Sequence, residues 1–272
     1  MKPWKDAVAI VTGGASGIGR ALCLGLGERG AIVVVADIDA DAAAEVARAI
    51  AAAGGRGSSR AVDVRDAAAV QRLVDEAVDE HGRIDFLFNN AGIGILGEQR
   101  DVTLDDWRRV LDVNLNGVVH GVVAAYPTMV RQGRGHIVNT ASLAGLIPAA
   151  LELSYTASKY AVVGLSQGLR AEGARLGVRV SVVCPGFIDT PILQQSEIRS
   201  PVERAPLMKM IPTPMPPEKC ARAILKGVAQ NRSTIVVTAH AKLLYALHRL
   251  SPALVERLWI GVIDRFRAER RS

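Results

Sequence analysis

The fold of this 272-residue chain is decided by the stretch Thr12-Gly13-Gly14-Ala15-Ser16-Gly17-Ile18-Gly19, which joins the apolar run Ala7–Thr12 to a segment of helical period. Glycines are needed where a backbone turns tightly and approaches a pyrophosphate with no Cβ in the way. The N-terminus of the following helix then offers free N–H groups and the positive end of its dipole to the anion. Because these glycines stand between a strand and a helix, they predict a dinucleotide-binding turn rather than an ordinary one.

Outward from this turn, apolar runs alternate with Ala-rich segments of helical period. Seven runs are expected to be strands: Ala7–Thr12, Ile32–Asp37, Arg60–Val64, Ile84–Asn89, His136–Thr140, Val178–Val183 and Thr234–Thr238. Helices are expected near residues 18–29, 40–53, 67–81, 104–132, 155–176 and 217–229. The alternation predicts an α/β fold of Rossmann type, with a doubly wound, seven-stranded parallel sheet flanked by helices.

The chain is expected to form one domain over residues 1–272. The stretch 186–217 carries seven prolines and is the least regular part, so it is expected to be a substrate loop. Residues 239–272 are expected to form a C-terminal helical extension.

Composition excludes several classes of protein. Hydrophobic residues make up 49% of the chain, which is enough for a large core and too much for a disordered or fibrous protein. The cysteines Cys23, Cys184 and Cys220 are widely spaced and match no metal-ligand pattern, so we expect no disulfide and no metal. The first residues show no signal-peptide pattern, and the longest stretch without Lys, Arg, Asp or Glu, Val113–Val130, is a poor membrane span. A cytoplasmic setting is expected.

The net charge of +6 is unevenly distributed. Residues 199–272 hold 14 basic and five acidic side chains, whereas residues 1–198 hold 19 basic and 22 acidic ones. A basic surface can attract nucleic acid, anionic lipid or an acidic ligand. The basic end is interleaved with apolar helical residues and has no groove-reading motif, so no nucleic acid is expected as a partner.

Asp37 ends the second expected strand, eighteen residues after Gly19. A carboxylate there can accept hydrogen bonds from both hydroxyls of an adenosine ribose and would repel a 2′-phosphate. Neither Ile38 nor Ser16 supplies a cation for such a phosphate, so NAD is favoured over NADP. Asp37 could instead cap the next helix, a role that Asp39 or Asp41 would fill equally well.

Several ordered motifs continue along the chain: Asn89-Asn90-Ala91-Gly92, Asn114, Ser142, Tyr155-Thr156-Ala157-Ser158-Lys159, and Pro185-Gly186 with Thr190. Together with the glycine turn they cover roughly residues 5–238, and no core motif position departs from the pattern. In this order and spacing the chain resembles the short-chain dehydrogenase/reductase (SDR) family, in its short single-domain branch. The resemblance implies a short-chain NAD-dependent alcohol dehydrogenase or ketone reductase that forms a homo-oligomer, a tetramer or a dimer.

The catalytic residues follow from residue chemistry and from the resemblance. Tyr155 and Lys159 share one face of a helix, because they are four residues apart. A phenol has a pKa of about 10 in water, and a nearby ammonium or an oxidised nicotinamide favours its deprotonated form. The resemblance implies that Tyr155 is the general acid/base and that Lys159 biases Tyr155 and holds the nicotinamide ribose. Ser142 would fix the substrate oxygen, and Asn114 would position a water that joins Lys159 to solvent.

The resemblance also implies contacts to the cofactor. Asp63 and Val64 would meet the adenine, Asn90, Ala91 and Gly92 would pass the adenosine ribose, and Ile188 and Thr190 would hold the carboxamide. The whole implied set is Gly13, Ser16, Gly17, Ile18, Gly19, Asp37, Asp63, Val64, Asn90, Ala91, Gly92, Tyr155, Lys159, Pro185, Gly186, Ile188 and Thr190.

The substrate side is apolar. Residues 143–151, which line the pocket in this family, read Leu-Ala-Gly-Leu-Ile-Pro-Ala-Ala-Leu, and Leu193, Leu207, Met208 and Met210 follow in the substrate loop. These residues predict a hydrophobic secondary alcohol or ketone, steroid-, fatty- or terpenoid-like, although several of them could simply be core.

Other functions stay open. An NADP-dependent ketone reductase and a catalytically silent nucleotide-binding protein share the same fold. Sugar epimerases are disfavoured by the length and the glycine spacing, and enoyl reductases by the close spacing of Tyr155 and Lys159.

The C-terminal tail predicts an amphipathic helix that begins at Ser251-Pro252, an N-cap followed by proline at the first helical position. Its apolar face is formed by Leu254, Val255, Leu258, Trp259, Val262, Ile263 and Phe266. Such a helix can cover its own pocket, pack against another subunit, or make a peripheral membrane contact with its arginines on anionic lipid.

Overall fold

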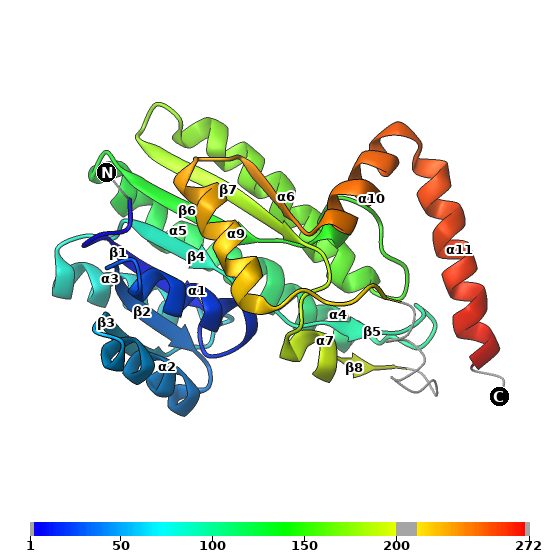
Figure 1. The fold of residues 1–272 in the computed structure, drawn as a ribbon, viewed down its shortest axis with the longest axis horizontal. Helices are drawn as coiled ribbons and strands as arrows, with labels where there is room; N and C mark the ends of the chain where they lie inside the picture. Colours follow the sequence, from blue (N-terminus) through cyan, green and yellow to red (C-terminus); the bar gives the residue numbers. More distant parts are fainter. Residues whose placement is uncertain (1–2, 200–210, 270–272) are drawn as a thin grey trace.

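The computed structural model of the chain describes residues 3–199 and 211–269. Within that range seven parallel strands form one sheet in the order β3-β2-β1-β4-β6-β7-β9, which confirms the predicted Rossmann-type topology (Figure 1). The strands of the sheet are β1 (Val8–Thr12), β2 (Ile32–Asp37), β3 (Arg56–Ala61), β4 (Phe86–Asn89), β6 (Gly135–Thr140), β7 (Val178–Pro185) and β9 (Thr234–Val237). A separate short pair joins β5 (Ile95–Leu96) to β8 (Glu197–Ile198).

Helices cover both faces of the sheet. They are α1 (Gly17–Gly27), α2 (Ala40–Ala52), α3 (Ala67–His81), α4 (Leu104–Leu111), the π-helix η1 (Asp112–Asn116), α5 (Gly117–Arg131), the short 3₁₀ helix η2 (Leu143–Gly145), α6 (Leu153–Gly173), α7 (Pro191–Gln195), α9 (Pro217–Ala229), α10 (Ala239–Leu250) and α11 (Pro252–Glu269). The buried side chains of α1, α2 and α9 pack on one face, and those of α3 and α5 pack on the other.

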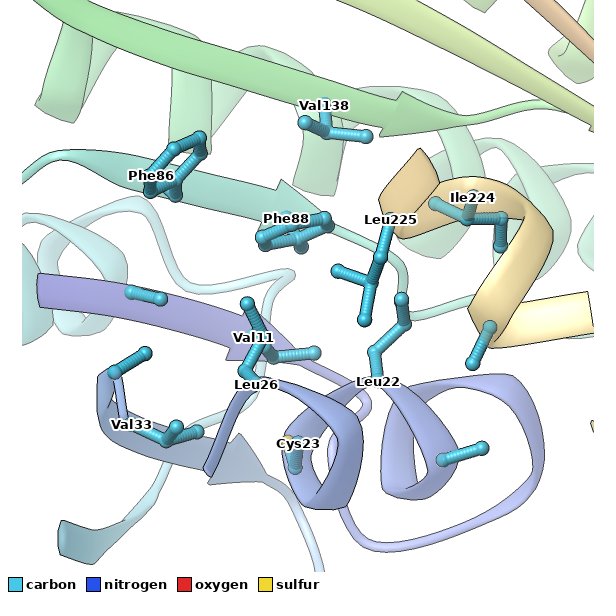
Figure 2. Packing of buried hydrophobic residues seen from close by; sticks show 14 of the residues in the cluster. Val11, Leu22, Cys23, Leu26, Val33, Phe86, Phe88, Val138, Ile224 and Leu225 are labelled. Atoms are coloured by element: carbon cyan, nitrogen blue, oxygen red, sulfur yellow. The ribbon is translucent and has the colours of Figure 1, made fainter. Parts of the chain in front are cut away.

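The core explains why the strand sequences are almost continuously apolar. Figure 2 shows Leu22 and Leu26 of α1 and Leu225 of α9 packed near Phe88 of β4. Ile10 of β1 faces the opposite cluster, and all of these side chains are buried. Strands covered on both faces need apolar residues at nearly every position. The strand order places the carboxyl ends of β1, β4 and β6 side by side, and ligands bind at this edge of such sheets.

The third strand differs from its prediction. We expected Arg60–Val64, whereas β3 runs over Arg56–Ala61. β3 is one of the two edge strands, and among the described strands it pairs only with β2, so its polar residues stay partly exposed. Arg60 forms ion pairs with Glu76 and Glu80 of α3. The apolar residues that suggested a strand, Val62 and Val64, are buried just beyond its end.

The helix expected over residues 104–132 is interrupted. Between α4 and α5 the π-helix η1 contains a bond from Gly117 N–H to the Asp112 carbonyl, and it holds the fully buried Asn114. A π-helical turn inside an α-helix is typical of functional positions, because it re-aims side chains at the cost of regular hydrogen bonding.

The C-terminal extension contains two helices where one was expected. α11 begins at Pro252 as predicted, and α10 precedes it, starting directly after β9. Figure 1 shows the two helices as a pair standing beside the carboxyl end of the sheet. In the substrate loop, Leu207, Met208 and Met210 lie outside the described residues. None of the helices in the described ranges is long and apolar enough to cross a membrane.

Candidate active site

The glycine turn is built so that only glycine fits. Gly13 and Gly17 have φ values of +62° and +50°. A Cβ on Gly19 would lie 1.9 Å from the Gly13 carbonyl oxygen, and Asn90 Nδ2 donates to that same carbonyl over 3.2 Å. Ser16 precedes α1 but its side chain makes no capping bond, so the N–H groups of the first turn, at Gly17, Ile18 and Gly19, stay available to an anion. This cradle fits a pyrophosphate.

Asp37 is tied to this turn rather than to the next helix. Its Oδ2 accepts from the Ala15 N–H over 2.9 Å, and its Oδ1 accepts from the Asp39 N–H over 3.1 Å. The cap of α2 is Asp39, whose side chain accepts from the Ala42 N–H. Each carboxylate oxygen of Asp37 keeps a free lone pair, so the residue fits two ribose hydroxyls.

At the end expected to meet the adenine, the structure adds two residues that the sequence did not suggest. Arg65 binds Asp63 through Nη2 over 2.6 Å and holds the pKa of that carboxyl below its usual range. His120 Nδ1 lies 2.9 Å from the Val64 carbonyl oxygen. The cap of α3 is Asp66, so Asp63 is not needed for that role. Neither Arg65 nor His120 belongs to a motif, and only the fold brings His120 to this loop.

The stretch after β7 crosses in front of the glycine turn. A Cβ on Gly17 would lie 3.0 Å from Thr190 Cγ2, so the two segments are in close contact. Ile188 is 5% exposed and forms an isolated β-bridge with Met215. Thr190 is also buried, and Pro185 ends the strand beside Gly186. The fold therefore places this stretch where the far end of a dinucleotide would lie.

The four predicted catalytic side chains converge at the carboxyl ends of β4, β6 and β7. The Ser142 hydroxyl, just after β6, lies close enough to the Tyr155 phenol of α6 to lower its pKa. Lys159 Nζ donates to the Thr140 carbonyl over 2.9 Å and lies 5.4 Å from the centroid of the Tyr155 ring. Asn114 Oδ1 accepts from the Ile93 N–H over 2.8 Å.

Gly92 lies close to both Asn114 and Lys159. A Cβ on Gly92 would lie 3.2 Å from Asn114 Oδ1 and 3.5 Å from Lys159 Nζ. Its missing side chain therefore lets the amide of Asn114 and the ammonium of Lys159 approach the same point beside Ala91 and Asn90.

The electrostatics of the cluster differ from the simple expectation that Lys159 lowers the pKa of Tyr155. Burial and the neighbouring Glu152 raise the pKa of Tyr155 above its ordinary value, and only the hydrogen bond from Ser142 lowers it. Burial also lowers the pKa of Lys159 to about 8. Desolvation is the largest cause of both shifts, and it depends on how the folded chain packs around the two groups, which no local motif reveals.

With this geometry established, comparison with known proteins identifies the family. A family model described as short chain dehydrogenase matches residues 7–200. "Putative oxidoreductase SadH" of Mycobacterium tuberculosis is 34% identical over 271 residues, which cover 98% of each chain. The chain belongs to the short-chain dehydrogenase/reductase family. It is an oxidoreductase, and its match to SadH includes the C-terminal extension.

Further members of the family carry more specific names. "Cyclohexanol dehydrogenase" of an Acinetobacter strain is 36% identical over 208 residues, 76% of this chain and 83% of that protein. A crystal structure of an SDR protein from Burkholderia phymatum in complex with NAD superposes with a TM-score of 0.85 at 31% identity, covering 93% of this chain and 96% of that one. A metagenomic SDR oxidoreductase in complex with NADP gives 0.71 at 32% identity, covering 86% and 98%. Members of the family thus bind either nicotinamide cofactor.

His240 is a residue near the site that the sequence did not suggest. It lies in α10, and its Nε2 accepts from the Phe187 N–H over 3.1 Å while the two rings stack with centroids 5.5 Å apart. A Cβ on Gly186 would lie 2.2 Å from the same Nε2. Thr238, the N-cap of α10, has a φ of +81°, which is strained for a β-branched residue. The extension therefore fixes the stretch that runs on to Ile188.

Proposed function

We propose that this protein is an NAD-dependent dehydrogenase of hydrophobic secondary alcohols, with Tyr155 as the general acid/base. The observation that carries the proposal is the convergence of Ser142, Tyr155 and Lys159 next to a glycine turn that fits a pyrophosphate. When bound, the nicotinamide accepts or delivers the hydride, and its oxidised form carries a positive charge that favours the Tyr155 phenolate.

The side chains of the chain divide the remaining tasks. Ser142 holds the substrate oxygen through its hydroxyl, which fixes the carbinol for hydride transfer. Tyr155 takes the proton from that oxygen during oxidation and returns it during reduction. Lys159 binds the nicotinamide ribose, and Asn114 positions the water that connects Lys159 to solvent. The approach of Asn114 and Lys159 around Gly92 supports this relay.

The proposed substrate class rests on the stretch 143–151. Leu143, Ile147 and Leu151 are buried, and the first two pack in one cluster with Val255 of α11. They are thus partly core, and we propose that the stretch 143–151 also forms an apolar wall of the substrate site. The name of the cyclohexanol dehydrogenase relative supports an apolar secondary alcohol.

The test is a cofactor-reduction screen of steroid, fatty, terpenoid and alicyclic alcohols with NAD and NADP side by side. Turnover of several hydrophobic secondary alcohols supports the proposal. Turnover restricted to sugars or small hydroxy acids contradicts the proposed substrate class.

Replacing Asp37 with alanine is expected to lower kcat/KM for NAD about 10- to 100-fold and to raise the preference for NADP, because hydrogen bonds to a charged group are worth about 1.5–3 kcal/mol. Initial rates with each cofactor measure the change. Asp39→Ala is the matched control, since it removes the cap of α2 but leaves the carboxylate of Asp37 in place. An unchanged cofactor ratio in Asp37→Ala would mean that this carboxylate does not select NAD.

Replacing His240 with alanine is expected to weaken NADH binding about 2- to 10-fold, because one neutral hydrogen bond contributes about 0.5–1.5 kcal/mol. Burial lowers the pKa of His240, so Nε2 stays an acceptor at neutral pH and loses that role only as the pH falls below the ordinary histidine range. NADH fluorescence titration measures the affinity. His240→Gln keeps an acceptor and is expected to restore most of it, whereas equal losses in both variants would contradict this role.

The proposal also concerns the C-terminal extension, the oligomeric state and the cellular setting. Val255 and Phe266 of α11 are buried on the protein itself, so we propose that the extension covers the pocket of its own chain, as part of a single domain, rather than a membrane. Exposed Leu104 of α4 and Val123 of α5 support a homo-oligomer formed through those helices. A reducing, cytoplasmic setting fits the three free, buried cysteines.

A further inference from the structure

Two arginines and two carboxylates outside the catalytic cluster form a connected group of ion pairs between α4 and β8. Arg199 donates to Asp106 of α4 from Nη2 over 2.8 Å and from Nε over 3.1 Å. Arg199 Nη2 also donates to one carboxylate oxygen of Glu197 over 2.6 Å, and Arg109 of α4 donates to the other. These contacts tie the two residues that flank Ile198 of β8 to a single helix.

The Asp106 carboxylate is almost fully buried, with 3% of its side chain exposed. It completes the capping box of α4 with Thr103, whose N–H and hydroxyl both donate to Oδ2. The hydrogen bonds from Arg199 hold the pKa of Asp106 far below its usual range, so the carboxylate stays charged at neutral pH. A buried charge is costly without a partner, so the Arg199 guanidinium is held at this place more firmly than an exposed one would be.

The strand pair beside these charges is too short to fix its own register. β5 and β8 have two residues each, and their pairing places Ile198 beside Leu96. The Arg199 N–H donates to the Leu96 carbonyl over 2.7 Å. Short strand pairs are marginally stable alone, and a slip of one residue would turn every side chain of β8 to the other face. The contact of Arg199 with Asp106, directly after β8, opposes such a slip.

Two glycines let β8 approach β5 this closely. A Cβ on Gly94 would lie 2.9 Å from Ser196 Oγ, and a Cβ on Gly97 would lie 2.9 Å from the Arg199 carbonyl oxygen. Both distances are shorter than a side-chain carbon tolerates, so the positions on either side of β5 need glycine for this register. Backbone and charges thus specify the same place for β8.

The other end of this part of the substrate loop is fixed at the cofactor side. Thr190 Cγ2 lies 3.0 Å from the position that a Cβ on Gly17 would occupy, and α7, which carries Leu193, follows Thr190. The segment from Thr190 to Arg199 is therefore held at two points, the glycine turn and Asp106. Releasing the second point would displace the apolar residues of α7, while the first point keeps the cofactor end in place.

We propose that Asp106 is a positioning residue that sets substrate specificity: through Arg199 it fixes where β8 lies, and so where the apolar side of α7 stands beside the bound alcohol. The inference rests on the proposed function, in which Ser142 and Tyr155 hold the carbinol itself. The ion pair therefore acts on the part of the alcohol that extends away from the carbinol. Long apolar alcohols should depend on the pair, whereas short ones should not.

The test uses the full-length protein, NAD and three secondary alcohols with the same carbinol, which are 2-propanol, 2-hexanol and 2-decanol. Wild-type protein is expected to prefer 2-decanol over 2-propanol by about 10-fold or more in kcat/KM, since each buried methylene adds to binding. Arg199→Gln is expected to lower kcat/KM for 2-decanol about 10-fold or more, mainly through KM, because it removes hydrogen bonds to a charged group. The value for 2-propanol and the dissociation constant of NADH are expected to stay within about 2-fold.

A second variant and a control separate positioning from stability. Asp106→Asn keeps an acceptor for Thr103 and removes the buried charge, so it is expected to reproduce the effect of Arg199→Gln even if the latter lowers stability. The double variant is expected to be no worse than the more affected single one, because Asp106 acts through Arg199. Arg108→Gln is the matched control, since Arg108 lies on the same helix, is exposed and pairs with Asp105.

Every other outcome overturns the inference. It fails if wild-type protein oxidises none of the three alcohols or shows no preference for 2-decanol. It also fails if both variants keep that preference, if they lower kcat/KM equally for 2-propanol and 2-decanol, or if Arg108→Gln has the same effect. An equal loss would mean that the ion pair only stabilises the fold. The proposed function stands in these cases as long as another hydrophobic secondary alcohol of the screen is oxidised, and it fails when none is oxidised although NADH still binds.

Discussion

Replacing Tyr155 with phenylalanine is expected to lower kcat for alcohol oxidation by about 10²- to 10⁴-fold, the usual contribution of a positioned general acid/base. The phenol lies near the Ser142 hydroxyl, and the Tyr155 ring lies under the ammonium of Lys159. Phenylalanine keeps the ring, so only the phenol oxygen is lost in this variant. The affinity for NADH is expected to change little, because the glycine turn and Asp37 are untouched. Stopped-flow hydride transfer and NADH titration separate the two effects.

The same residue predicts the pH dependence. Burial and Glu152 raise the pKa of Tyr155, so at neutral pH the phenol is protonated and ready to act as an acid in reduction. Oxidation needs the phenolate, and its rate is therefore expected to rise from neutral to alkaline pH while the reduction rate stays level. Tyr155→Phe should remove this difference. Full turnover in Tyr155→Phe would show that another group moves the proton. It would also contradict the alternative of a catalytically silent nucleotide-binding protein.

The sheet could be predicted from the sequence because its signal is local. Strands buried on both faces, such as β1 and β4, must be apolar at nearly every position, and the glycine turn marks where the first of them ends. The bounds of β3 were predicted wrongly because this strand lies at an edge of the sheet, where polar residues such as Arg56 and Arg60 are tolerated. Edge position is a property of the assembled sheet, so no window of sequence contains it.

The candidate site could be predicted in its membership but not in its electrostatics. The resemblance to the family's motifs implies Ser142, Tyr155 and Lys159, and the structure brings them together. The direction of the pKa shifts follows from how completely the walls exclude water, which depends on residues distant in sequence. The sequence did not predict that Glu152 and His240 lie near the site, for a related reason. Each is an ordinary polar residue until the fold places one beside Tyr155 and the other against Phe187.

Replacing Phe266 with alanine is expected to loosen the segment around Leu151 that leads into α6. Phe266 is 1% exposed and packs on Leu151, and the next residue, Arg267, donates from Nε to Glu98 Oε1 over 2.7 Å. Truncating a buried phenylalanine costs about 3–5 kcal/mol. Leu151 in its left-handed conformation adds about 1–2 kcal/mol of strain, which the packing on α11 has to offset.

The free energy lost in Phe266→Ala should appear locally, because α11 can detach without unfolding the sheet. Hydrogen exchange followed by mass spectrometry is expected to show protection falling about 100-fold or more along α11 and in the segment around Leu151. Leu258→Ala is the matched control, since Leu258 lies on the same helix but is 53% exposed, and its effect should stay within about 0.5 kcal/mol. The KM for the alcohol should rise more than the dissociation constant of NADH, because the released segment leads into Tyr155 and not into the glycine turn. If Phe266→Ala and Leu258→Ala show the same hydrogen-exchange protection, the extension does not hold Leu151 in place. The position of the next residue, Glu152, must then be determined by α6 alone.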